Sequence, residues 1–134
     1  MKNYTIISFV LLLLLASCSK DNFAAKKLDG LWKMSSVKVN NAELISTDTK
    51  METSFSGISE NTGRYNTKVF LLNVLVSEAN GDFMVSADGT KITLDEDGTS
   101  TPGTGTIIEL TTKFIHVSYT DSDGNLVIFK GDKQ

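Results

Sequence analysis

Very few side chains in this 134-residue chain could carry out catalysis, because the sequence holds one cysteine and one histidine. His116 lies in the alternating segment Phe114 to Val117, with no partner at the spacing of metal ligands. A Ser-His-Asp arrangement cannot be assembled around it, as a hydrolase would require. A lone histidine of this kind is typical of a strand face. We therefore expect no enzymatic activity, no metal and no other cofactor.

Two acidic clusters have part of the pattern of a calcium-binding loop. Asp121, Asp123 and Asn125 occupy the first three alternating ligand positions of such a loop, but Leu126 stands where the loop requires glycine. The run Asp95 to Gly98 is acidic as well. Aspartate and glycine at these densities are typical of hairpin turns, and we expect turns at both places.

Residues 1–17 have the composition of a cleaved export signal. Lys2 precedes an apolar stretch from Tyr4 to Leu15, which at about 12 residues is shorter than the roughly 20 that a membrane-spanning helix needs. The sequence Leu15-Ala16-Ser17-Cys18 resembles the bacterial lipobox. This resemblance implies that the sulfur of Cys18 receives a diacylglycerol and that the leader is cut before it. The alternative is an ordinary secretory signal that happens to end at a cysteine.

The segment 18–27 is then the lipidated cysteine and its tether. No aspartate follows Cys18 directly, so the pattern that retains many lipoproteins in the inner membrane is absent. Lys20 and Asp21 resemble the short charged tether of some surface lipoproteins, or form a plain solvated spacer. We expect a bacterial cell-envelope protein, held to the outer membrane by the lipid on Cys18, on its periplasmic or its cell-surface side.

The charge of the chain argues against nucleic acid as a partner. Without residues 1–17, 12 basic residues remain against 16 acidic ones, a net charge of −4. Nucleic acids and anionic lipid surfaces are bound by clustered lysine and arginine, which a mildly acidic chain does not favour. A single cysteine also excludes an internal disulfide, so the domain must be held together by its core.

From residue 30 onward, apolar and polar residues alternate with a period of two, which predicts strands rather than helices. In the first strand, Trp32 and Met34 share one face with Ser36, and Val37 lies on the other. The segment 68–79 is rich in β-branched residues and is predicted as strand, with a buried helix as the alternative. Expected turns are Asn40-Asn41, Asn80-Gly81, Asp88-Gly89 and Asp123-Gly124, with a loop over 95–105. The expected strands are 31–39, 51–56, 64–77, 82–86, 91–94, 106–110, 113–119 and 125–129.

About eight short antiparallel strands joined by short connections can form a sandwich or an up-and-down barrel, and sequential hairpins favour the barrel. The opening Leu28 to Met34, with Gly30 and Trp32, resembles the Gly-x-Trp start of lipocalin-like domains. Segments 82–94, 107–119 and 127–130 are similar to later strands of that family. The resemblance implies an all-β, lipocalin-like barrel over residues 28–134, with the tryptophan lying across its closed end.

An eight-stranded barrel is just wide enough to be filled by its side chains or to hold one small apolar ligand. We expect a lipid-anchored, lipocalin-like envelope protein that binds or carries such a ligand. The alternative is a packed barrel that acts as a protein-interaction module, either as a subunit of an envelope complex or as an inhibitor- or immunity-type factor. The candidate ligand-binding side chains are Trp32, Phe55, Tyr65, Phe70, Phe83, Val117, Tyr119 and Phe129.

Overall fold

A computed structural model describes residues 23–134, so the leader and Cys18 lie outside the described residues. A short 3-10 helix, η1 (Ala24–Leu28), leads into strands only. In the described part of the chain, no helix is long and apolar enough to cross a membrane. The strands are β1 (Gly30–Val39), β2 (Ala42–Glu43), β3 (Thr49–Ser59), β4 (Thr62–Leu71), β5 (Val74–Val85), β6 (Lys91–Glu96), β7 (Gly103–Leu110), β8 (Phe114–Thr120) and β9 (Leu126–Lys133).

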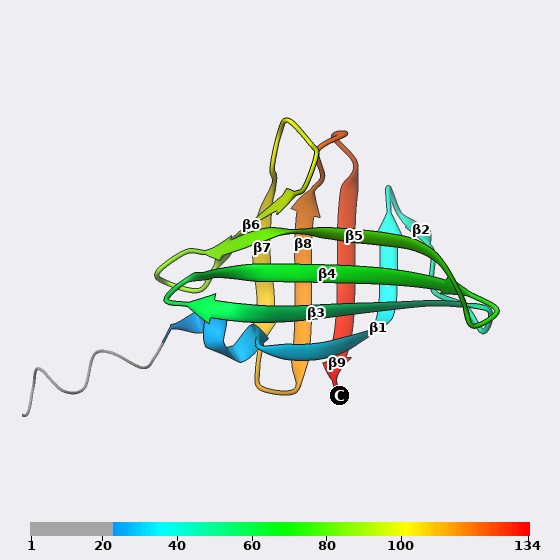
Figure 1. The fold of residues 1–134 in the computed structure, drawn as a ribbon, viewed down its shortest axis with the longest axis horizontal. Helices are drawn as coiled ribbons and strands as arrows, with labels where there is room; N and C mark the ends of the chain where they lie inside the picture. Colours follow the sequence, from blue (N-terminus) through cyan, green and yellow to red (C-terminus); the bar gives the residue numbers. More distant parts are fainter. Residues whose placement is uncertain (1–22) are drawn as a thin grey trace, which may run out of the picture.

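The strands form a closed antiparallel barrel, as the alternation predicts. Each strand from β3 to β9 pairs with its neighbour in the chain, and β1 pairs with both β3 and β9, which closes the eight-stranded cylinder (Figure 1). The two-residue strand β2 is the one addition, paired to the end of β1. Every barrel strand is thereby paired on both sides, although β1 meets β3 only over residues 30–33. The all-β, up-and-down barrel is thereby confirmed.

The expected orientation of Val37 is wrong, because strand β1 contains a bulge. Met34 pairs with Gly131 but Ser36 pairs with Lys130, so β1 carries one extra residue at this point. A bulge reverses the alternation beyond it. Val37 consequently points into the core with Met34, instead of lying on the opposite face.

The expected turn at Asn80-Gly81 is wrong, and so is the single long strand 64–77. The chain turns at Leu72 and Asn73, which adopt φ of 51° and 64°, and Gly81 lies inside β5 opposite Tyr65. Gly81 serves close packing, because a Cβ there would lie 2.7 Å from a ring carbon of Tyr65. The helix alternative for 68–79 is excluded. The other three expected turns are confirmed by positive φ at Asn40, Asn41, Gly89 and Gly124.

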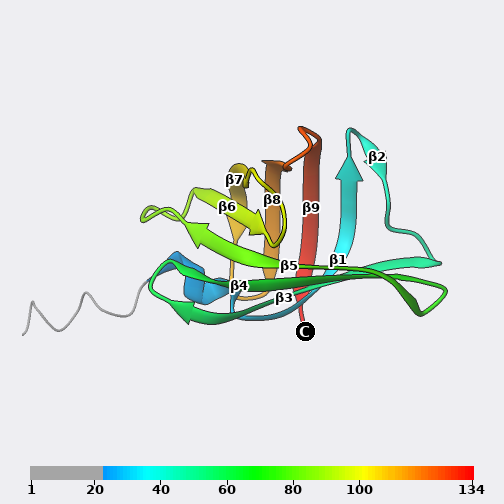
Figure 2. The same cartoon turned by 45° about the horizontal axis from the view of Figure 1, so that its top comes forward.

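One end of the barrel is closed by η1 and the turns β3–β4, β5–β6 and β7–β8, and the connections β4–β5, β6–β7 and β8–β9 lie at the opposite end (Figure 2). At the closed end Trp32 is completely buried, and its Nε1 donates a hydrogen bond of 2.7 Å to the carbonyl of Leu28. The Lys133 ammonium lies 5.5 Å from the centre of the indole ring. Trp32 therefore closes this end, as the lipocalin resemblance implies.

Candidate functional site

The barrel contains a cavity of about 220 Å³ in the half that faces the β4–β5, β6–β7 and β8–β9 connections. Its residues come from β1 and β3 to β9, as expected for the interior of a cylinder. Most of the lining surface is apolar. Its polar groups are mainly side-chain hydroxyls, and several of them lie near the open end. The apolar and aromatic lining residues are Met34, Met51, Phe55, Tyr65, Val69, Ala79, Leu94, Tyr119 and Phe129.

Strand alternation and residue size explain why this half of the barrel is hollow. On β4, the lining residues Tyr65, Thr67 and Val69 are spaced by two, which places them on one face of the strand. Across from them, β5 contributes only the small side chains Ser77 and Ala79. The small residues on β5 leave space unfilled in this half of the barrel, whereas larger side chains fill the closed half. The large, fully buried side chains that do not line the cavity are Leu28, Trp32, Val37, Phe83, Val85, Ile92, Ile115 and Val117.

The structure brings four of the eight candidate ligand-binding residues together. Phe55, Tyr65, Tyr119 and Phe129 line the cavity, and the rings of Tyr119 and Phe129 meet edge to face with their centres 6.0 Å apart.

The other four do not line the cavity. Trp32 and Val117 belong to the filled half, and Phe83 packs edge to face on Phe55, with ring centres 5.2 Å apart. Phe70 follows the lining residue Val69, so alternation places it on the outer face of β4.

Sequence reasoning missed the polar half of the lining. The available signal was a single threonine between two larger residues on the inner face of each of two paired strands: Thr53 on β3 and Thr67 on β4. The Oγ1 atoms of Thr53 and Thr67 lie 2.9 Å apart across the two strands and share a hydrogen bond. The further polar lining residues are Ser77, Glu96, Thr99, Thr101, Asp121 and Ser122.

The two tyrosines present polar groups to the cavity. Among residues 23–134, neither the Tyr65 nor the Tyr119 hydroxyl has a hydrogen-bond partner. Burial, and then the nearby charges of Asp121 and Glu96, raise the pKa of Tyr119 to about 12. Burial and the Glu96 charge also raise the pKa of Tyr65 well above its ordinary value. Both phenols are therefore neutral at physiological pH and free to exchange hydrogen bonds with a guest.

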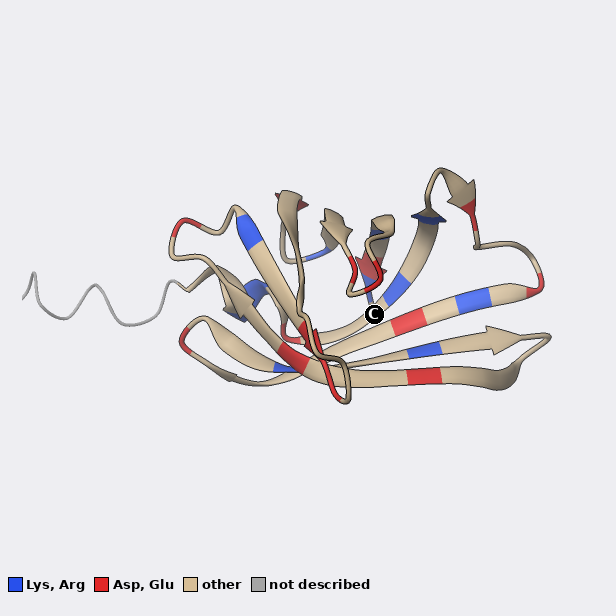
Figure 3. Cartoon of the chain, turned by 90° about the horizontal axis from the view of Figure 1, so that it is seen from above, with Lys and Arg blue, Asp and Glu red and all other residues tan. Residues whose placement is uncertain are grey.

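The charged groups on the cavity wall are both acidic. Glu96 and Asp121 line it, and its residues include no lysine, arginine or histidine. Figure 3 looks onto the open end and shows acidic segments at the β6–β7 and β8–β9 connections. The Asp121 carboxylate accepts hydrogen bonds from the backbone N–H groups of Asp123 (2.9 Å) and Asn125 (2.8 Å). Burial opposes ionisation of Asp121, but these bonds outweigh it and lower the pKa below the usual range.

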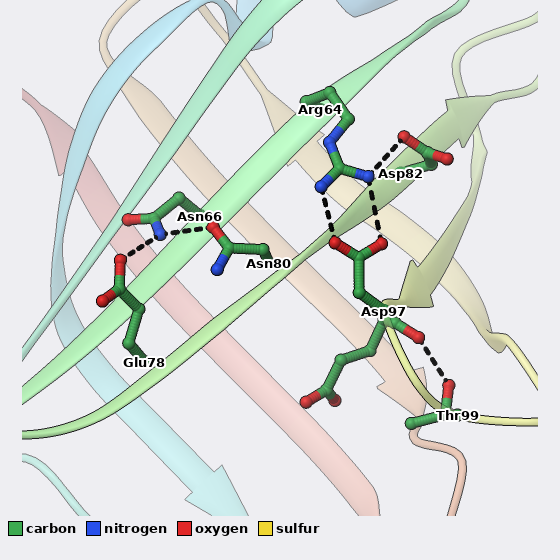
Figure 4. Close-up of polar contacts among 8 residues, drawn as sticks. Arg64, Asn66, Glu78, Asn80, Asp82, Asp97 and Thr99 are labelled. Carbon is green, nitrogen blue, oxygen red and sulfur yellow. Dashed lines mark hydrogen bonds and ion pairs between the residues drawn. The ribbon is translucent and has the colours of Figure 1, made fainter.

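Of the sequence features that suggested chemistry, His116 lies outside the cavity, whereas each acidic cluster contributes one lining residue, Glu96 or Asp121. His116 lies on β8 between the paired residues Glu109 and Lys130, and burial, then the Lys130 charge, lowers its pKa against the opposing effect of Glu109. Within residues 23–134, no three His, Cys, Asp or Glu side chains come together as a metal site. The acidic run after β6 is used structurally: Asp97 forms a two-bond ion pair with Arg64, at 3.0 and 2.6 Å (Figure 4).

A second depression of about 640 Å³ lies on the outside of the barrel, lined by residues such as Arg64, Asp82, Met84, Thr93 and Asp95. This depression is more open to solvent than the interior cavity. The Arg64 guanidinium within it is already bound to Asp82 and Asp97. Ligand sites that bury most of a small molecule are concave and largely apolar. The interior cavity matches that description better than this groove does.

The β4–β5 hairpin carries a patch of exposed apolar side chains at the open end, which we call the apolar tip. The side chains are between 46% and 67% exposed, although most apolar groups of this size are buried. Leu72 adopts a left-handed conformation there, a position that ordinarily favours asparagine or glycine. The apolar tip consists of Leu71, Leu72, Val74, Leu75 and Val76.

The comparisons with known proteins concern the fold. No protein-family model and no curated protein matches the chain. A de novo designed fluorescence-activating β-barrel aligns with a TM-score of 0.60 at 14% identity, over 84% of this chain and 99% of the design. A redesigned barrel, mFAP1, bound to DFHBI aligns with the same TM-score at 15% identity, over 84% of this chain and 100% of the other.

A natural protein shows the same architecture. The complex of bovine odorant binding protein with a selenium-containing odorant aligns with a TM-score of 0.51 at 18% identity, over 82% of this chain and 72% of the other. At these identities the likeness shows the fold alone. The chain therefore has a lipocalin-like eight-stranded barrel fold, of a class in which both natural and designed examples have been solved with a small molecule bound.

Proposed function

We propose that this protein is a lipid-anchored binding or carrier protein of the bacterial cell envelope, which holds a small apolar ligand inside its barrel. The observation that carries the proposal is the hollow, mainly apolar half of the barrel. A barrel evolved only as a packed scaffold would gain stability by filling this volume, since each buried methylene contributes about 0.8 kcal/mol. A volume that side chains leave unfilled is what a barrel that holds a guest requires.

The anchor is proposed from the sequence. Cys18 is separated by five residues from Ala24, where η1 begins. An extended chain covers roughly 3.5 Å per residue, so the lipid would lie within about 20 Å of the closed end. The cavity opens at the other end, which would leave its mouth directed away from the anchoring bilayer. Such an arrangement suits exchange of a ligand with the surrounding compartment.

Native mass spectrometry of the full chain, extracted in mild detergent from its own host, tests the proposal. We expect a mass excess from one bound small molecule, which is released on denaturation. The variant Ala79→Leu, which places a larger side chain on the cavity wall, should lose that excess while remaining folded. Absence of any guest from the native protein would contradict the carrier function.

Mass analysis of the N-terminal peptide tests the anchor separately. A peptide beginning at Cys18 with diacylglycerol on its sulfur is the expected product, and Cys18→Ser should retain the uncut leader. A mature protein cut elsewhere, with a free thiol at Cys18, would refute the anchor and leave the cavity proposal untouched.

A second candidate function, a protein-interaction module, is favoured by the apolar tip. Exposed apolar patches on soluble domains often mark interaction sites. The occupant would be a partner protein with an apolar cleft that accepts the hairpin tip. A partner that co-purifies with the native chain and with Ala79→Leu, but is lost from Leu72→Asn, would support this function. A partner retained by Leu72→Asn would count against it.

A further inference from the structure

We propose that the cavity selects a small apolar amine, bound as its ammonium ion, over a neutral analogue and strongly over a carboxylate or phosphate. This inference rests on the proposed function, since it names the ligand class of the same site. It follows from the charges on the cavity wall, from the free tyrosine hydroxyls, and from the size of the space.

The charge on the wall has one sign. Glu96 and Asp121 are part of the lining, and no cationic side chain is. The nearby guanidinium of Arg64 is held on the outer face by Asp82 and Asp97, at 3.0 and 2.6 Å, so it offers no free positive charge to a guest. A carboxylate ligand would face two like charges without a counter-ion, whereas an ammonium ion would meet two opposite ones.

The acidic side chains also act on the two tyrosines inside the cavity. Ionisation of Tyr65 and Tyr119 is opposed by burial and also by Glu96, and for Tyr119 by Asp121. Burial disfavours a charged guest of either sign, whereas the carboxylate charges disfavour an anion and favour a cation. The tyrosine hydroxyls lack partners among residues 23–134 and can accept hydrogen bonds from an ammonium group. The faces of these rings attract cations as well.

The size of the cavity limits the rest of the molecule. A protein cavity of about 150 Å³ is known to hold benzene. At about 220 Å³, this cavity has room for one ring and a chain of a few atoms. The apolar part would lie among Met34, Phe55 and Phe129, with the ammonium group toward Glu96 and Asp121 at the open end. An amphiphile with a long acyl chain would not fit within this volume.

Three probes of matched shape test the inference: 2-phenylethylamine, 2-phenylethanol and 3-phenylpropionate. Binding of each to the full chain in mild detergent is measured by isothermal titration calorimetry at two salt concentrations. We expect the affinity order amine, alcohol, carboxylate, and a preference for the amine that shrinks as salt rises. Glu96→Gln is the informative variant, because the Glu96 side chain takes part in no hydrogen bond or ion pair among residues 23–134.

The variant should weaken amine binding about two- to five-fold and leave alcohol binding unchanged, as for a solvent-exposed ion pair. The matched control, Glu109→Gln, removes the same charge from the outer face beside His116 and should change neither. Binding of the alcohol together with equal or tighter binding of the carboxylate would overturn the amine preference while the cavity function stands. Failure of all three probes to bind would overturn both proposals.

Discussion

Ala79→Leu distinguishes a hollow barrel from a packed one by the sign of its effect on stability. Ala79 lines the cavity on β5, opposite Thr67. Leucine adds three carbon atoms, and full burial of each would contribute about 0.8 kcal/mol, or at most about 2.4 kcal/mol in all. The wall is partly polar and the cavity opens to solvent, so we expect the free energy of unfolding to rise by about 1–2 kcal/mol.

A packed interior would give the opposite result. Extra carbons forced into a filled core cost about 1–3 kcal/mol, so the two cases differ by several kcal/mol. Urea unfolding of the full chain in mild detergent, followed by fluorescence, measures the difference. The one tryptophan, Trp32, is buried in the filled half, outside the cavity lining, and reports global unfolding without contact with the substituted side chain.

The matched control for this experiment is Ala87→Leu. Ala87 is exposed in the β5–β6 turn, so the same change should alter stability by less than about 0.5 kcal/mol. A fall in stability for Ala79→Leu beyond that of the control would refute the hollow cavity.

Three further variants or conditions test the structure at other places. Trp32→Ala should lower the free energy of unfolding by about 3–5 kcal/mol, because it empties the closed end and removes the hydrogen bond to Leu28. Thermal melting followed by circular dichroism measures this, and a loss below about 1 kcal/mol would contradict the role of Trp32. Leu72→Asn should raise stability by about 1 kcal/mol, because asparagine tolerates the positive φ of 51°; a lower denaturation midpoint would show that the leucine stabilises the turn. Stability should fall as pH rises from about 10 to about 12, because the pKa of Tyr119 is raised in the folded state and the unfolded chain releases its proton first. Tyr119→Phe should make this dependence of stability on pH shallower, and an unchanged dependence would contradict the burial of the Tyr119 phenol.

The barrel was predictable from the sequence because its signals are local. Alternation identifies the strands, and dipeptides such as Asp88-Gly89 and Asp123-Gly124 identify turns. The wrongly predicted turn shows that local sequence signals alone do not determine every turn. Asn80-Gly81 has the composition of a turn, but Gly81 is small in order to pack beneath Tyr65, a residue far away in the sequence. Leu72 gives no turn signal at all, since its side chain is unfavourable for the conformation it adopts.

The candidate site was predictable only in part. Alternation shows that Phe55 and Phe83 face inward, but it does not show which half of the barrel each residue occupies. That depends on the stagger of neighbouring strands, which the pairing of β4 with β5 and of β1 with β9 sets. The bulge in β1 is likewise a property of two paired strands. The hollow itself comes from small side chains such as Ala79 standing opposite Thr67, a relation between strands that one strand's pattern does not contain.

The most direct test of the central claim is methyl NMR of the full chain in mild detergent under xenon pressure. Apolar cavities of this size take up xenon. If the barrel is hollow, xenon should cause saturable shifts at the methyl groups of Met34, Met51 and Leu94, which line the cavity, and these shifts should be lost in Ala79→Leu. Shifts confined to exposed methyl groups such as those of Leu72, with none in the interior, would show that the barrel holds no ligand cavity.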